Sequence, residues 1–151
     1  MYQQELTQSE KIRAEYLKDV ELLSKYMGYL EKRAGSGVTS FYEGEEDFKV
    51  IQIPVYESTM LSFVKDAGKT KFIDKNYRHT YTKYKIRGVE DELRLIKHAH
   101  LKDIDLFKAI LSNYILQGRS KGLMWSEGVK NGVFLEWMRR ATALFFATNV
   151  E

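Results

Sequence analysis

The chain has 151 residues, of which 24 are Lys or Arg and 21 are Asp or Glu, so its formal net charge is +3. A chain of this length buries about 70% of the surface that it exposes when unfolded, which predicts one globular domain over residues 1–151. It contains no Cys, which excludes disulfides, thiolate metal sites and a cysteine nucleophile.

The N-terminal segment and the apolar runs bear on the location of the protein. Residues 1–15 are polar and lack the apolar segment of a signal peptide. No apolar run approaches the about 20 residues that span a bilayer. We therefore expect a cytoplasmic protein that does not bind a membrane.

The first predicted element is one long helix over residues 7–34. Thr7 and Glu10 have the spacing of a capping box. Gly35 follows the last turn, where a left-handed residue commonly ends a helix. Apolar residues recur every three or four positions and form one buried stripe: Ile12, Tyr16, Val20, Leu23, Met27 and Leu30.

A small antiparallel hairpin is predicted next. Residues 38–42 and 48–53 are rich in β-branched and aromatic side chains, which favour strands. The polar connector 43–47 contains a glycine for the turn. Pro54 is expected to end the second strand.

Two further segments precede the helical last third. A short helix is predicted over residues 58–67, with Met60, Leu61 and Val64 facing the interior. Residues 72–86 are ambiguous, but the alternation of Thr80, Thr82, Tyr84 and Ile86 with Tyr81, Lys83 and Lys85 favours an extended segment.

The last third is predicted to be a helical bundle. A helix begins after Gly88 with acids in its first turn, where they suit the helix dipole. A second helix follows Asp103 and ends near Gly118, and an apolar helix follows Gly132. The fold class is therefore α+β and mostly helical, with a long N-terminal helix, a small hairpin and a C-terminal bundle.

The segment 69–87 is the first candidate binding surface. It has one acid, Asp74, among many cations and tyrosines. Cations neutralise phosphates and aromatic rings stack on bases, so this composition suits a nucleic-acid or phosphate-binding groove. A solvated edge strand protected by lysines is the alternative. The candidate residues are Lys75, Tyr77, Arg78, Tyr81, Lys83, Tyr84, Lys85 and Arg87.

The final helix is the second candidate surface, because its apolar residues cover more than one face. Such a helix is either central to the core or shared with a partner. Trp and Arg are favoured anchors at interfaces, which also makes homodimerisation through this helix a prediction. The candidate interface residues are Trp125, Trp137, Arg140, Phe145 and Phe146.

No other constellation carries a chemical prediction. The acids of segment 43–47 lack the ligand spacing of a calcium loop, and His98 and His100 are interpreted as polar residues at a helix end. The chain has no nucleophile elbow, P-loop, dinucleotide fingerprint or zinc-protease motif. We therefore expect no catalytic residues, no metal and no cofactor.

The order of elements in the last third resembles a known family. An apolar helix (LFKAILSNYI), a basic turn (LQGRSKG), Asn131-Gly132 and a helix with Arg139-Arg140 follow one another, and Pro54-Val55-Tyr56 lies upstream. Over roughly residues 50–145, this order is similar to small bacterial and phage-borne domains of unknown function. The resemblance implies a fold of this kind and no particular activity.

Three functions follow from these patterns. The first is a non-catalytic module that binds another protein, as a regulator or inhibitor of phage or mobile-element origin. The second is a binder of nucleic acid or a phosphate ligand through segment 69–87. The third is an enzyme without a recognisable motif, and it has the least support in the sequence.

Overall fold

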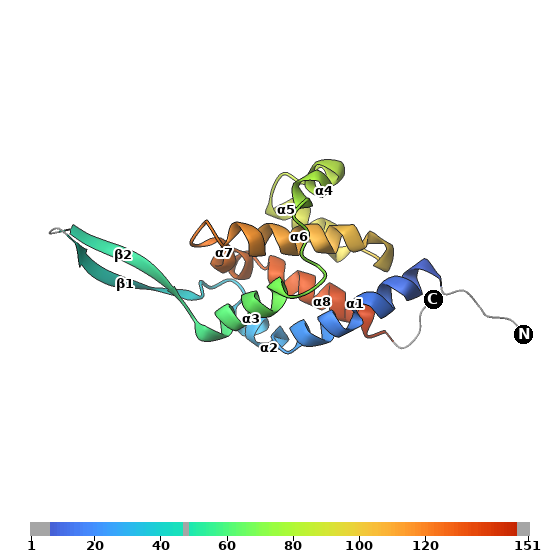
Figure 1. Cartoon of the computed structure of the whole chain (residues 1–151), viewed down its shortest axis with the longest axis horizontal. Helices are drawn as coiled ribbons and strands as arrows, with labels where there is room; N and C mark the ends of the chain where they lie inside the picture. The colour runs from blue at the N-terminus through green and yellow to red at the C-terminus, as the bar shows by residue number, and fades with distance from the viewer. Residues whose placement is uncertain (1–6, 47–48, 148–151) are drawn as a thin grey trace, which may run out of the picture.

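The computed structural model describes residues 7–46 and 49–147, and for residues 40–54 it describes the backbone only. Helices predominate, as the sequence predicts, and two strands extend away from them (Figure 1). The helices are α1 (Gln8–Ser24), α2 (Met27–Arg33), α3 (Ser58–Gly68), α4 (Tyr77–Tyr84), α5 (Val89–Lys97), α6 (Ile104–Gln117), α7 (Met124–Lys130) and α8 (Val133–Phe145), with a 3₁₀ turn at Leu101–Asp103. The strands are β1 (Thr39–Glu46) and β2 (Lys49–Tyr56).

The opening segment is two helices, so the prediction of one helix over residues 7–34 is wrong. The Thr7 side chain caps α1 by accepting the amide of Glu10 at 3.2 Å. The chain then turns at Lys25 and Tyr26, which both contact Asp66 of α3, at 3.1 Å and 2.6 Å. This contact lies 40 residues away in sequence, so local periodicity does not show it.

The predicted apolar stripe is nevertheless largely buried across this break. Its fully buried members are Tyr16, Val20, Leu23 and Leu30, while Ile12 and Met27 are partly buried against the same core. Gly35 has a φ of 82° after the end of α2, the left-handed conformation that glycine adopts without strain. The stripe and the stop at Gly35 are therefore confirmed.

The two strands are longer than the segments predicted. They pair antiparallel, with Thr39 opposite Tyr56 and Glu46 opposite Lys49. Strand β2 continues through Pro54 to Tyr56, so Pro54 does not end it. In a two-stranded sheet each strand has an outer edge, where proline's missing N–H costs no ladder bond. The side chains of the acidic segment 43–47 lie outside the described residues.

Helix α3 buries the predicted face except for one residue. Met60 and Val64 are buried, as predicted, but Leu61 is 47% exposed. Phe63 and Ala67 complete the buried face, because they share the three- and four-residue spacing of Met60 and Val64. Leu61 follows Met60 directly and is turned about 100° away from it, as the pitch of a helix requires.

Residues 77–84 form helix α4, so the prediction of an extended segment over 72–86 is wrong. The alternation of Thr80, Thr82 and Tyr84 suggested a strand. The residues that face the protein interior instead recur at helical spacing, as Tyr77, Thr80, Tyr81 and Tyr84. Helix α4 packs on α6, and it ends at Lys85, whose φ is 56°.

The remaining helices follow the sequence prediction closely. Helix α5 begins after Gly88 with Glu90, Asp91 and Glu92 in its first turn. Asp103 does not cap α6, because its carboxylate accepts the amide of His100 at 2.8 Å. That bond stabilises the 3₁₀ turn before α6.

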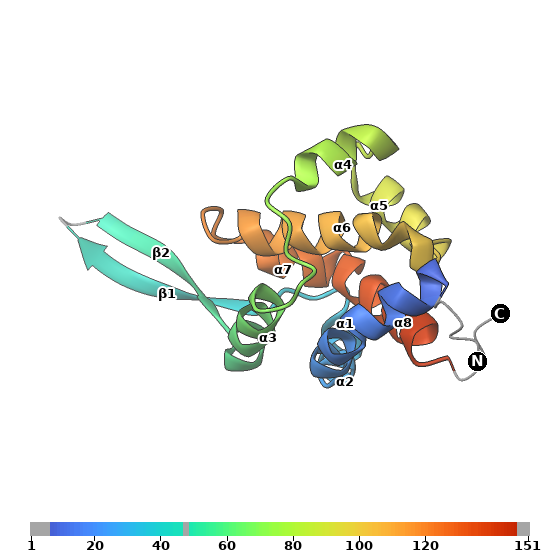
Figure 2. The same ribbon diagram turned by 45° about the vertical axis from the view of Figure 1, so that its right-hand side comes forward.

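Helix α8 lies inside the core and contacts α1, α2, α5, α6 and α7. Its buried residues are Val133, Phe134, Leu135, Trp137, Met138, Ala141 and Phe145. Figure 2 shows α4 on the far side of α6 from α1 and α2. No helix within residues 7–46 and 49–147 is long and apolar enough to cross a membrane.

Candidate nucleic-acid interface

The densest cationic segment covers α4 and the turn that follows it. Residues 75–87 contain Lys and Arg but no Asp or Glu. All the cations of this segment are exposed to solvent, and they are Lys75, Arg78, Lys83, Lys85 and Arg87. Helix α4 lies at the periphery of the molecule (Figure 1).

The inner face of α4 is held by hydroxyl groups. Tyr77 and Thr80 are only 7% and 8% exposed. The Tyr81 hydroxyl donates a hydrogen bond to Glu92 of α5, and the Tyr84 hydroxyl donates one to Asp105 of α6 at 2.9 Å. The predicted stacking role of Tyr77, Tyr81 and Tyr84 is thus at odds with their inward contacts, which anchor α4.

The faces of two of these rings are also covered. The Arg78 guanidinium lies 5.7 Å from the centroid of the Tyr77 ring, and Lys83 Nζ lies 5.3 Å from that of Tyr84. The rings of Tyr77 and Tyr81 meet edge to face at 6.3 Å. Each tyrosine of the segment therefore already has a partner within the chain.

The cations differ in whether an acid neutralises them. Lys83 forms an ion pair with Asp105 at 2.9 Å. Among the residues whose side chains the structure describes, the other four cations of the segment form no ion pair within 4.0 Å. Those four are Lys75, Arg78, Lys85 and Arg87.

A pocket of about 400 Å³ opens beside the end of α4, lined by Tyr81, Thr82, Lys85, Ile86 and Arg87. The left-handed conformation of Lys85 creates it by reversing the chain, so that the amide of Ile86 bonds to the Tyr81 carbonyl at 2.9 Å. The pocket therefore places two cations next to a helix end.

Asp91 fixes the far side of this turn. It accepts the backbone amide of Arg87 and the side chain of Arg94, each at 2.9 Å. These two hydrogen bonds, that of Arg87 first, lower the pKa of the Asp91 carboxyl. Asp91 therefore stays charged at neutral pH. It bonds to the backbone amide of Arg87, while the Arg87 side chain is exposed to solvent.

Behind α4 lies a buried polar cluster centred on Glu92, which is 3% exposed. Glu92 accepts hydrogen bonds from Tyr81, from Tyr114 at 2.7 Å and from Asn113 at 3.5 Å. Asn131 in turn donates to the Tyr114 hydroxyl at 3.0 Å, so the cluster joins α4, α5, α6 and the end of α7. Burial raises the pKa of Glu92, and the hydrogen bonds to its carboxylate oppose that rise.

The sequence prediction missed this cluster, because Glu92 was interpreted only as one of three acids in a first helical turn. One signal was present. Glu92 lies four residues before the buried Ile96, which places its carboxylate on the inward face of α5.

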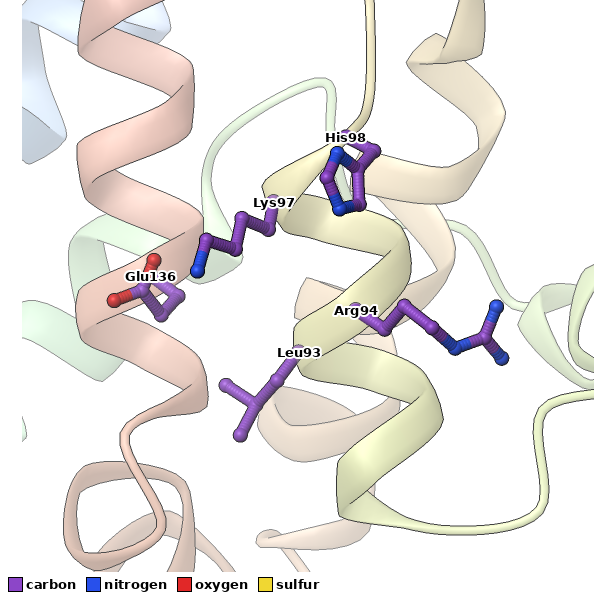
Figure 3. A pocket seen from close by; sticks show the side chains of 5 residues that line it. All are labelled: Leu93, Arg94, Lys97, His98 and Glu136. Atoms are coloured by element: carbon purple, nitrogen blue, oxygen red, sulfur yellow. The ribbon is translucent and has the colours of Figure 1, made fainter.

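A second pocket, of about 440 Å³, lies between α5 and α8 (Figure 3). Lys97 points across it toward Glu136, whereas Arg94 points away (Figure 3). His98 lies at its rim, and Glu136 also pairs with Arg139 at 3.3 Å. The lining of this pocket includes an acid, whereas the lining of the pocket beside α4 does not.

The predicted interface residues are mostly engaged within the chain. Trp137 and Phe145 are buried in the core, so they offer no surface to a partner. Trp125 donates to the Ile115 carbonyl at 3.1 Å, and Arg140 donates to the Ala99 carbonyl at 2.8 Å. Phe146 alone of the five is clearly exposed, at 41%. The apolarity of α8 therefore no longer argues for a homodimer.

No protein-family model, curated protein or solved structure gives a significant match to this chain. The resemblance to the domains of unknown function therefore remains a prediction.

Proposed function

We propose that the protein binds nucleic acid through phosphate contacts made by α4 and the turn after it. The observation that carries this proposal is the set of four exposed cations, Lys75, Arg78, Lys85 and Arg87, which form no ion pair within 4.0 Å with a described side chain. They lie within a segment without any Asp or Glu.

The physical argument is electrostatic. Each phosphate neutralised by a cation releases condensed counterions, and this release supplies the affinity of sequence-independent binding. Lysines and arginines already paired with acids within the protein contribute less, because the pair must first be broken. The segment 75–87 contains no acid and lies on a peripheral helix, so its cations are both accessible to phosphates and largely free of competing ion pairs.

Binding to another protein through the final helix has lost its main support, because that helix is in the core. A partner protein would instead need an acidic surface that fits the α4 cations. Such a protein competes for the same face, and the experiment below separates the two cases.

The test is fluorescence anisotropy with a labelled 20-base-pair oligonucleotide of mixed sequence at several salt concentrations. The variant replaces Arg78, Lys85 and Arg87 by Ala. The matched control replaces Lys11, Lys18 and Lys32 by Ala, which are also exposed but lie on α1 and α2. Both triple variants remove the same charge from the protein.

We expect the wild type and the control to bind with an affinity that falls steeply with salt. The α4 variant should lose at least tenfold in affinity at low salt. Equal losses in the two variants would show an effect of net charge alone. No binding by the wild type at low salt would refute the proposal and favour an acidic protein partner.

A further inference from the structure

We infer that the α4 surface takes double-stranded nucleic acid and holds it mainly by its phosphate backbone. This inference rests on the proposed function and specifies its ligand. Two observations carry it: the tyrosine rings of the segment are already engaged, and the cations that pair with no described acid lie at both ends of α4.

Proteins that hold a single strand without sequence preference combine a cationic groove with aromatic rings on which bases stack. The tyrosines of α4 do not form such a platform. Tyr77 is buried beneath Arg78, Tyr84 lies beneath Lys83, and the hydroxyls of Tyr81 and Tyr84 bond to carboxylates behind the helix. Stacking of a base on these rings would require breaking those contacts.

The exposed side chains of the segment are mainly the cations, with Asn76 and His79 beside them. The Thr82 hydroxyl is also engaged, because it donates to the Arg78 carbonyl at 3.1 Å. A surface in which Lys and Arg predominate makes most of its contacts to phosphates, which position the protein on the nucleic acid. Such a surface gains most from the form with the higher density of phosphates, which is the duplex.

The spacing of the cations fits two strands. Lys75 and Arg78 lie at the start of α4, and Lys85 and Arg87 follow its end. Arg78 and Lys85 are seven positions apart, which corresponds to about 10 Å along a helix axis. The major groove of a duplex is about 12 Å wide, so the two pairs of cations can reach phosphates on opposite sides of a groove.

The number of unpaired cations sets the expected salt dependence. Each phosphate contact to a duplex contributes about −0.9 to the slope of log K against log salt concentration. Four contacts therefore give a slope no steeper than about −3.6. Lys83 adds little to this slope because it is paired with Asp105.

The first experiment compares one labelled 20-base-pair duplex with each of its separate strands, by anisotropy at the same salt concentration. We expect the duplex to bind at least fivefold more tightly than either strand. A strand that binds as tightly as the duplex overturns the inference but leaves the proposed function standing. If wild-type protein binds neither form, the proposed function itself fails.

A second experiment tests the rings directly with Tyr84→Phe and Tyr84→Leu. Both variants remove the hydroxyl that bonds to Asp105, but only Tyr84→Leu also removes the ring. We expect the two variants to bind the single strand, and likewise the duplex, with affinities equal within twofold. A loss of more than fivefold for Tyr84→Leu relative to Tyr84→Phe would show that the ring stacks on a base, and would overturn the inference.

Discussion

Helices α8 and α4 are held in the molecule by different kinds of contact. Helix α8 is surrounded by other helices and is held by apolar packing, with Trp137 against Phe72 and Phe107 at ring distances of 4.9 Å and 5.7 Å. Helix α4 packs mainly on one helix, and two of its tyrosines donate to carboxylates.

The difference explains why one helix is structural and the other is available for binding. A helix that is apolar on most faces stabilises the fold when other elements cover those faces, because the stabilisation comes from apolar surface removed from water. A helix anchored by hydroxyl groups on one face keeps its opposite face in water. In α4 that opposite face carries the cations.

The largest expected effect tests the apolar side of this comparison. Trp137→Ala removes a buried ring and the bond from its indole N–H to the Phe107 carbonyl. We expect the free energy of unfolding to fall by about 3–5 kcal/mol, measured by urea denaturation. Phe146→Ala, at an exposed site, is the control and should cost less than about 1 kcal/mol. Similar losses for the two variants would contradict the buried position of α8.

The next effect tests the hydroxyl anchor of α4. Tyr81→Phe and Tyr114→Phe each remove one donor from Glu92, and each should cost about 1.5–3 kcal/mol as a bond to a charged group. Only Tyr81 lies on α4. Hydrogen exchange of the α4 amides should therefore accelerate more in Tyr81→Phe. If both variants loosen α4 equally, Glu92 does not anchor that helix specifically.

A smaller effect separates the two carboxylates that anchor α4 by their pH dependence. Burial raises the pKa of Glu92, so its contribution to stability is full below its unfolded pKa of about 4.3 and declines as pH rises through the folded value. Asp105 behaves oppositely. Burial alone would raise its pKa, but hydrogen bonds from Lys83 and Tyr84 lower it overall, so its contribution is lost as pH falls below about 3.9.

Urea denaturation of Glu92→Gln and Asp105→Asn between pH 3 and pH 8 measures these contributions. The stability advantage of the wild type over Glu92→Gln should narrow as pH rises, whereas its advantage over Asp105→Asn should narrow as pH falls. The same direction for both variants would contradict the assignment.

The smallest expected effect concerns the turn that ends α4. Lys85 has a φ of 56°, a conformation that costs residues other than glycine about 1 kcal/mol. Lys85→Gly should therefore raise the free energy of unfolding by about 0.5–1 kcal/mol. The same variant should weaken nucleic-acid binding and reduce the salt slope by about 0.9. A variant that is less stable than the wild type would contradict the predicted gain in stability. A variant that binds nucleic acid as tightly as the wild type would contradict the predicted loss of binding.

Sequence patterns predicted the elements whose causes are local. The buried residues Tyr16 and Val20, the stop at Gly35 and the helices of the last third follow from spacing and turn chemistry. At the break between α1 and α2, Tyr26 bonds to Asp66, and the buried Glu92 accepts a bond from Tyr114. Such partners are distant in sequence, so periodicity does not reveal them.

The candidate site was predicted in part for the same reason. The position of the cations is a property of the sequence and holds in the fold, where they are exposed. The role of the tyrosines cannot be read from the sequence, because a tyrosine can either stack its ring on a base or donate a hydrogen bond from its hydroxyl to the protein interior. Asp105 and Glu92 decide that role for Tyr84 and Tyr81, and neither acid was recognised as their partner.

The most direct measurement is an NMR titration of ¹⁵N-labelled protein with an unlabelled duplex at low salt. We expect the backbone and arginine side-chain signals of residues 75–88 to shift together and to return as salt is added, while those of α8 do not move. Shifts centred on the pocket between α5 and α8, or an unchanged α4, would contradict it.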